Sequence, residues 1–203
     1  MPDAAYRLSF TTGGLLRVEG AAVAEMLLSA PDAATARAKA IASNVVQQRS
    51  AASTSRVTRE VLQRLSTLPQ PGLELLAHGA VDDGRHLMWF AACARYRFLR
   101  DFGQAVLRER PIVTPADFDT FWNLQSAWAD ALRDATVSTR IKLRQNTFRM
   151  IREAGYLDVD GQVRQAQLGS AVVAVIRAAD QELFLSFPMD TARLRAVAQQ
   201  RGR

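Results

Sequence analysis

The side chains of this sequence that could do chemistry are hydrogen-bond donors gathered between residues 139 and 154. Arginine and lysine can pair with phosphates or with the acceptor edge of guanine, and asparagine and glutamine can pair in a bidentate way with adenine. A helix over this stretch turns about 100° per residue and places most of the donors opposite its apolar side. We therefore expect this stretch to contact duplex DNA, through Arg140, Lys142, Arg144, Gln145, Asn146, Arg149 and Arg152.

The ends of this helix can be read from the sequence. Thr136 and Ser138 are candidate N-caps, no breaker interrupts the run from Thr139 to Ala154, and Gly155 stands where a C′ glycine would end a helix. The side predicted to pack in the core consists of Ile141, Leu143, Thr147, Phe148, Met150, Ile151 and Ala154.

A short hairpin is predicted directly after this helix. Asp160-Gly161 separates two short alternating segments, residues 156–159 and 162–166, and would place Arg164 on a wing. Residues 126–134 are predicted to form a preceding helix. A basic helix alone is usually only a solvated surface, but a helix, a turn, a basic helix and a hairpin in this order predict a winged helix-turn-helix.

A second basic region is predicted in the N-terminal half. Helices are expected over residues 32–49, with Asp32 as N-cap, and over residues 56–68, with a serine-rich turn between them. Arg49, Arg56 and Arg59 are the candidate DNA contacts here. The alternative is that these charges are ordinary solvated side chains. Between residues 33 and 68 the sequence has one acid, Glu60, against six bases: Arg37, Lys39, Arg49, Arg56, Arg59 and Arg64.

Charge and cysteine content limit the class of protein. The formal net charge of +6, with a sequence pI near 10.4, suits a polyanionic partner. A single cysteine, Cys93, leaves no internal disulfide and no cysteine-based zinc site, which fits a reducing cytoplasm. The start Met1-Pro2-Asp3 lacks the basic segment of a signal peptide, and no apolar run is long enough to span a membrane. We expect a cytoplasmic protein without a membrane partner.

The sequence contains no recognisable catalytic constellation. A nucleophile with a base, a carboxylate pair or a metal cluster would each need a particular spacing. The two histidines, His78 and His86, flank a turn without a zinc-like ligand pattern around them. We expect a protein that is not an enzyme, with no cofactor, no metal and no small-molecule substrate.

The pattern of apolar residues predicts a mainly α fold with two helical lobes. Residues 1–112 form the predicted N-terminal bundle, with a short extended segment at 6–12, a helix over 14–29 and a central helix over 85–110. Residues 113–203 form the predicted C-terminal lobe, where Thr114 and Pro115 start a helix and closing helices follow over 170–185 and 190–200. The aromatic body of that lobe is predicted from Phe118, Phe121, Trp122 and Trp128.

Several segments together resemble the BrxA family of bacteriophage exclusion (BREX) defence systems. They are Tyr6–Leu16, Asn44–Ser50, Arg56–Leu68, Ser138–Leu143 and Glu153–Leu157. The resemblance implies a small, all-helical, cytoplasmic, non-enzymatic component of a multi-protein phage-defence system. It also implies a NusB-like N-terminal lobe, an ability to bind DNA, and other BREX proteins as partners.

Three hypotheses from different classes follow. The first, which we favour, is a double-stranded DNA-binding accessory protein that gains most of its affinity from phosphate contacts. The second is a protein scaffold whose basic surfaces dock acidic partner subunits. The third is a NusB-like RNA-binding factor, for which single-stranded or looped RNA would outcompete duplex DNA.

Overall fold

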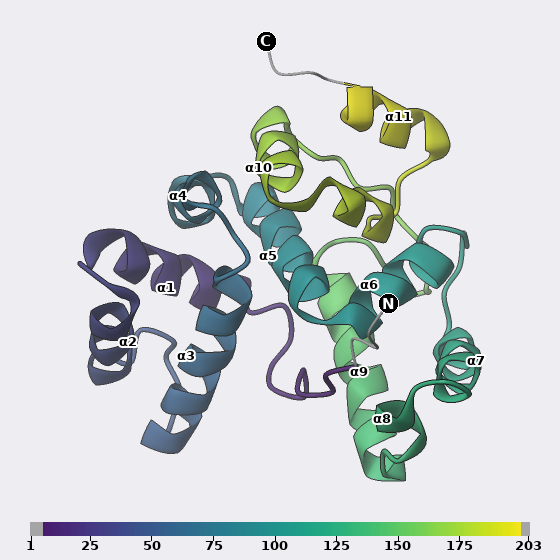
Figure 1. The fold of residues 1–203 in the computed structure, drawn as a ribbon, viewed down its shortest axis with the longest axis horizontal. Coiled ribbons are helices and arrows are strands. Elements are labelled where there is room, and N and C mark those ends of the chain that lie inside the picture. Colours follow the sequence, from purple (N-terminus) through teal and green to yellow (C-terminus); the bar gives the residue numbers. More distant parts are fainter. Residues whose placement is uncertain (1–5, 200–203) are drawn as a thin grey trace. The chain divides into compact units, whose positions relative to one another are not determined.

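The computed structural model describes residues 6–199 and confirms the mainly α fold (Figure 1). Residues 1–5 and 200–203, which include the end of the predicted closing helix, lie outside this range. None of the helices in the described range has an apolar run long enough to cross a membrane. The helices are α1 (Arg17–Ser29), α2 (Ala33–Ala42), α3 (Ala51–Leu65), α4 (Gln70–His78), α5 (Val81–Arg95), α6 (Arg97–Phe102), the π-helical turn η1 (Gly103–Leu107), α7 (Pro115–Ser126), α8 (Asp130–Arg133), α9 (Val137–Glu153), α10 (Ser170–Asp180), the 3-10 helix η2 (Gln181–Ser186) and α11 (Thr191–Gln199).

The chain forms two compact units, each built from separate segments. One contains residues 15–95 and 168–180 and is called the 15–95 unit below; the other contains residues up to 14, 96–167 and those from 181 onward and is called the 96–167 unit. The predicted division after residue 112 coincides with none of these crossing points. The predicted closing helix over 170–185 is likewise divided, because α10 belongs to one unit and η2 to the other.

In the 15–95 unit, α1 packs against α2, α3 and α4, and α10 packs against α4 and α5. Helix α2 begins where predicted, because the Asp32 side chain accepts a hydrogen bond from the Thr35 N–H at 2.7 Å. It ends at Ala42 instead of Arg49. Asn44 and Gln47 adopt left-handed backbone angles there, with φ of 49° and 51°, and the Asn44 side chain hydrogen-bonds the Gln48 backbone. Such local bonds compete with a helix.

The serine-rich segment predicted as a turn is instead the first part of α3. The Ser50 hydroxyl accepts a hydrogen bond from the Ser53 N–H at 3.2 Å, so the helix starts at Ala51 rather than at Arg56. A serine before an alanine pair is a good N-cap, and this start signal outweighs the turn propensity of the serines that follow.

The predicted central helix over 85–110 is interrupted at Tyr96. This residue has an extended backbone, with φ −117° and ψ 100°, and it divides α5 from α6. Its fully buried ring lies 5.2 Å from the ring of Phe10, centroid to centroid. Aromatic burial of this kind contributes several times the free energy of one helical hydrogen bond, so the tertiary contact stabilises the break.

An aromatic cluster centred on Phe98 forms the core of the 96–167 unit. As predicted, Phe118, Phe121 and Trp122 belong to it, whereas Trp128 was wrongly placed in the core and is 45% exposed. The N-terminal segment also belongs here rather than to an N-terminal bundle, because Phe10 stacks on Phe98. Residues 6–12 form no strand.

Candidate nucleic-acid interface

Helix α9 has the ends that the sequence predicts. The Thr136 hydroxyl accepts a hydrogen bond from the Thr139 N–H at 3.2 Å at its start. At its end Gly155 takes the left-handed conformation, with φ 82°. The Gly155 and Tyr156 N–H groups then donate to the carbonyls of Arg152 and Ile151, which is a Schellman motif. The residues at both ends therefore define the extent of α9 and, with it, which side chains lie on the surface of the helix.

The buried side of α9 consists mainly of the residues predicted for it: Leu143, Thr147, Phe148, Met150 and Ile151. Ile141 is the exception, because it is 42% exposed. It lies about 200° around the helix from Leu143, on the side that carries the polar residues. The buried side of α9 is therefore narrower than predicted.

Six residues form a continuous exposed stripe along α9 that spans about 100° of its circumference. Lys142 and Gln145 in this stripe make no side-chain hydrogen bond or ion pair with the described residues. Arg149 pairs with Glu153 at 2.7 Å but keeps 61% of its side chain exposed, and Arg152 lies over the ring of Phe148. The exposed stripe consists of Ser138, Ile141, Lys142, Gln145, Arg149 and Arg152.

The two other predicted arginines of α9 point to α7. Arg140 pairs with Asp119, Nη2 to Oδ1, at 2.9 Å and donates to Asn123, and Arg144 pairs with Asp119, Nη1 to Oδ2, at 2.6 Å. Both arginines are only partly exposed. Their guanidinium groups thus join α9 to α7. Asp119 and Asn123 are four residues apart and share one face of α7, and this spacing is the sequence signal that could have predicted the contact.

Asn146 also faces the interior of the unit. Its Nδ2 donates to the backbone carbonyl of Phe10 at 3.0 Å. A Cβ added to Gly14 would collide with the carboxylate of Glu153, so the N-terminal segment lies directly against α9. No local pattern in the sequence predicts these contacts, because more than a hundred positions separate the partners along the chain.

Residues 156–163 turn back on themselves as the Asp-Gly signal predicts. Leu157 pairs with Val163 in an antiparallel bridge, and Gly161 has φ 82°. The Asp158 carboxylate accepts hydrogen bonds from the backbone N–H groups of Asp160 and Gln162, which fixes the turn. Arg164 is exposed just beyond this turn, and its Nη2 lies 3.8 Å from the Asp158 Oδ2.

A third short segment, for which the sequence contains no strand signal that we recognised, pairs with this hairpin. Ile112 forms an antiparallel bridge with Gln162. The Val113 N–H donates to the Gly161 carbonyl, and the Val163 N–H donates to the Pro111 carbonyl, both at 2.8 Å. The segment 111–113 precedes α7, so the hairpin is held at the same end of the unit as the start of that helix.

The N-terminal candidates, Arg49, Arg56 and Arg59, are exposed in the 15–95 unit. Arg64, which was counted with them, is fully buried, and its Nε lies 2.8 Å from the Glu60 Oε1. The i, i+4 spacing of Glu60 and Arg64 indicates a pair, but only the packing of α3 shows that the pair lies in the core. Because Glu60 is buried with Arg64, the surface between residues 33 and 68 keeps the five other bases, and its net positive charge is unchanged.

Fold and surface together define an all-helical protein that presents a cationic helix followed by a short hairpin. The family model of BrxA matches residues 4–180, and the chain belongs to the BrxA family.

Two relatives are both named "BREX protein BrxA". The one from Escherichia coli O9:H4 (strain HS) is 25% identical over 161 residues, covering 77% of this chain and 76% of that protein. The one from Bacillus cereus (strain H3081.97) is 25% identical over 124 residues, covering 59% of this chain and 62% of the relative.

The fold is also found in a crystal structure of an uncharacterized protein from Magnetospirillum magneticum. The TM-score is 0.75 at 21% identity, covering 91% of this chain and 98% of the other. At this identity the similarity defines the fold only.

Proposed function

We propose that this protein is a non-enzymatic, double-stranded DNA-binding accessory of a BREX phage-defence system and works in the cytoplasm. The observation that carries the proposal is the exposed stripe of α9, where three cations and one amide lie on one face with a single neighbouring acid, Glu153. Such side chains match phosphates and base edges. The names of the two relatives support the BREX role and suggest other BREX proteins as partners.

The order of elements around the stripe supports the same function. Segment 111–113, helix α7, the short helix α8, helix α9 and the hairpin 156–163 follow one another, and the first segment pairs with the last. This order fits a winged helix in which α9 is the recognition helix. Recognition helices contact bases with their N-terminal residues, and in α9 these include Ile141, Lys142 and Gln145. An isoleucine can contact the thymine methyl group, as other apolar side chains do.

The test is fluorescence anisotropy on labelled duplex DNA across a salt series. Alanine at Lys142, Arg149 and Arg152 together should weaken binding at least about tenfold and reduce the log-log salt slope by about 2.7, since each lost phosphate contact contributes about 0.9. Gln145→Ala should leave that slope unchanged and alter the preference among sequences.

The matched control replaces Arg49, Arg56 and Arg59 by alanine, which removes the same charge from exposed positions of the other unit. If this control loses binding and the α9 variant keeps it, the contact lies on α3 and the residues just before it. RNA competing better than duplex DNA would favour the NusB-like hypothesis, and binding to no nucleic acid would favour the scaffold.

A further inference from the structure

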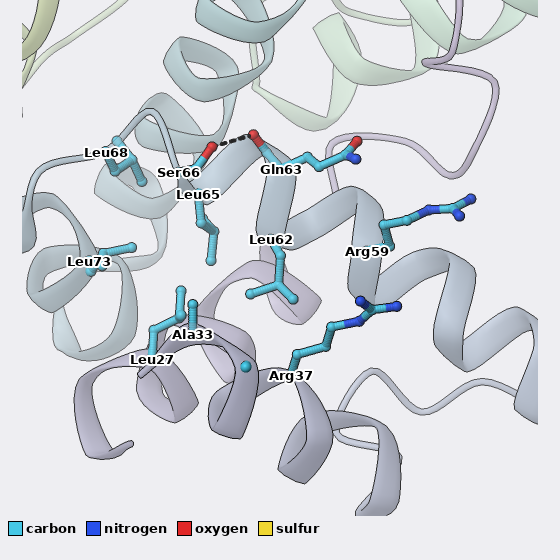
Figure 2. Close-up of a pocket in the computed structure, with 11 residues that line it drawn as sticks. Leu27, Ala33, Arg37, Arg59, Leu62, Gln63, Leu65, Ser66, Leu68 and Leu73 are labelled. Atoms are coloured by element: carbon cyan, nitrogen blue, oxygen red, sulfur yellow. Dashed lines mark hydrogen bonds between the residues drawn. The ribbon is translucent and has the colours of Figure 1, made fainter. Parts of the chain in front are cut away.

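The 15–95 unit contains a hollow of about 610 Å³ between α1, α2, α3 and α4. Figure 2 shows that Leu62 and Leu65 point from α3 toward Leu27 and Ala33. Leu62 and Leu27 are only partly buried, so apolar surface faces the hollow. Leucine side chains therefore form its floor: Leu27, Leu62, Leu65, Leu68 and Leu73.

Two arginines lie at one end of this floor. Arg37 extends from α2 and Arg59 from α3, and their guanidinium groups lie on the same side in Figure 2. Both side chains are exposed, and neither forms a hydrogen bond or an ion pair with the described residues. The nearby acids are engaged elsewhere: Glu60 is buried with Arg64, and Asp32 caps α2. The rim is cationic without an internal counterion.

A leucine floor with two arginines at its rim disfavours nucleic acid as the ligand of this hollow. No aromatic side chain lines the hollow, so bases would find nothing to stack on. Placing phosphates over leucines would remove their hydration without a partner. An apolar side chain with a carboxylate beside it satisfies both halves of the surface, because the apolar group fills the floor and the carboxylate meets a guanidinium.

We propose that this hollow is a docking site for an acidic amphipathic helix of a partner protein. The helix would insert leucine-like or phenylalanine-like side chains at i, i+3 and i+4 spacing and direct glutamates or aspartates toward Arg37 and Arg59. The proposal concerns a different surface from the exposed stripe of α9 and does not require DNA binding.

The experiment is a selection from a displayed library of helical peptides on the immobilised full chain. The best peptides are then labelled, and their affinities are measured by anisotropy for the wild type and two variants. Arg37→Glu with Arg59→Glu reverses the charge of the rim. Lys39→Glu with Arg56→Glu makes the same change on the same two helices at exposed positions that do not line the hollow.

Selected peptides should be rich in both acidic and apolar residues. Their affinity should fall about tenfold or more for the rim variant, and by less than about threefold for the control. Ala34→Trp, at an exposed position that lines the hollow, should also abolish binding, and circular dichroism checks that each variant is folded.

The proposal is overturned if the selection enriches no peptide or if enriched peptides bind the rim variant and the control equally. It is overturned as well if unlabelled duplex DNA displaces the peptide and the rim variant binds that DNA more weakly than the control variant does. Loss of DNA binding in the α9 variant alone leaves these outcomes unaffected, so the two proposals fail separately.

Discussion

At the scale of single residues, the pair of Glu60 and Arg64 shows how burial changes the meaning of a charge. Arg64 is fully buried, and its Nη1 also donates to the Leu15 carbonyl at 3.2 Å. A buried ion pair adds little net stability over an apolar pair of the same shape, because desolvation offsets the attraction. Removing one partner leaves an uncompensated charge in the core. The pair therefore restricts which substitutions α3 tolerates at positions 60 and 64.

Glu60→Leu should lower the free energy of unfolding by about 3–5 kcal/mol, since it strands the Arg64 guanidinium. The double variant Glu60→Leu with Arg64→Met should recover most of this loss. Urea denaturation measures both. A single variant as stable as the wild type would mean that water reaches the guanidinium in solution.

At the scale of elements, the start of α7 is a capping box. The Thr114 N–H donates to the Asp117 Oδ2 at 2.7 Å, and the Thr114 hydroxyl donates to the same oxygen. Arg110 pairs with the other carboxylate oxygen at 2.6 Å. Burial acts to raise the pKa of Asp117, but these hydrogen bonds and the Arg110 charge outweigh it and lower the pKa. The ionised carboxylate is the form that holds the helix start.

Asp117→Asn should cost about 1 kcal/mol of unfolding free energy at neutral pH. Because the pKa of Asp117 is lower in the folded than in the unfolded chain, its contribution is present above the unfolded value and is lost as pH falls through the folded one. Urea titrations of the wild type and the variant should therefore converge in acid. A constant difference at every pH would refute an ionic origin, and Thr114→Ser, which keeps the hydroxyl, serves as the control.

At the scale of the whole molecule, the chain does not complete one unit before starting the next. The N-terminal segment belongs to the 96–167 unit, where Phe10 is fully buried and the Tyr6 hydroxyl lies 2.7 Å from the Asp101 Oδ2. Burial and the carboxylate raise the pKa of the Tyr6 phenol, so it stays protonated as a donor. The stability of α9 thus depends on residues at the other end of the sequence.

Phe10→Ala should lower the stability of the 96–167 unit by about 3–5 kcal/mol. Hydrogen exchange followed by mass spectrometry should show faster exchange in α7 and α9, with α3 much less affected. Val23→Ala, a buried substitution in the 15–95 unit, should show the reverse pattern. Equal loss of protection in both units for either variant would show that they unfold as one.

The sequence by itself determined the helical class, the family and several helix ends. The predicted N-cap positions of three helices are occupied as expected, by Asp32, Thr114 and Thr136, and Gly155 ends α9. These ends could be predicted because capping depends on residues within one turn of each other. The four exposed donors of α9 could be assigned for a similar reason, since helical periodicity is local. The hairpin could be predicted from the single dipeptide Asp160-Gly161.

Only the tertiary structure decided which polar residues are free. Arg140 and Arg144 are held by Asp119, Asn146 by the Phe10 carbonyl, and Arg64 lies in the core. The break at Tyr96 and the place of the N-terminal segment also came from contacts between distant positions. Periodicity tells which side of a helix is polar. It does not tell what lies opposite that side, because this depends on how the chain folds back on itself.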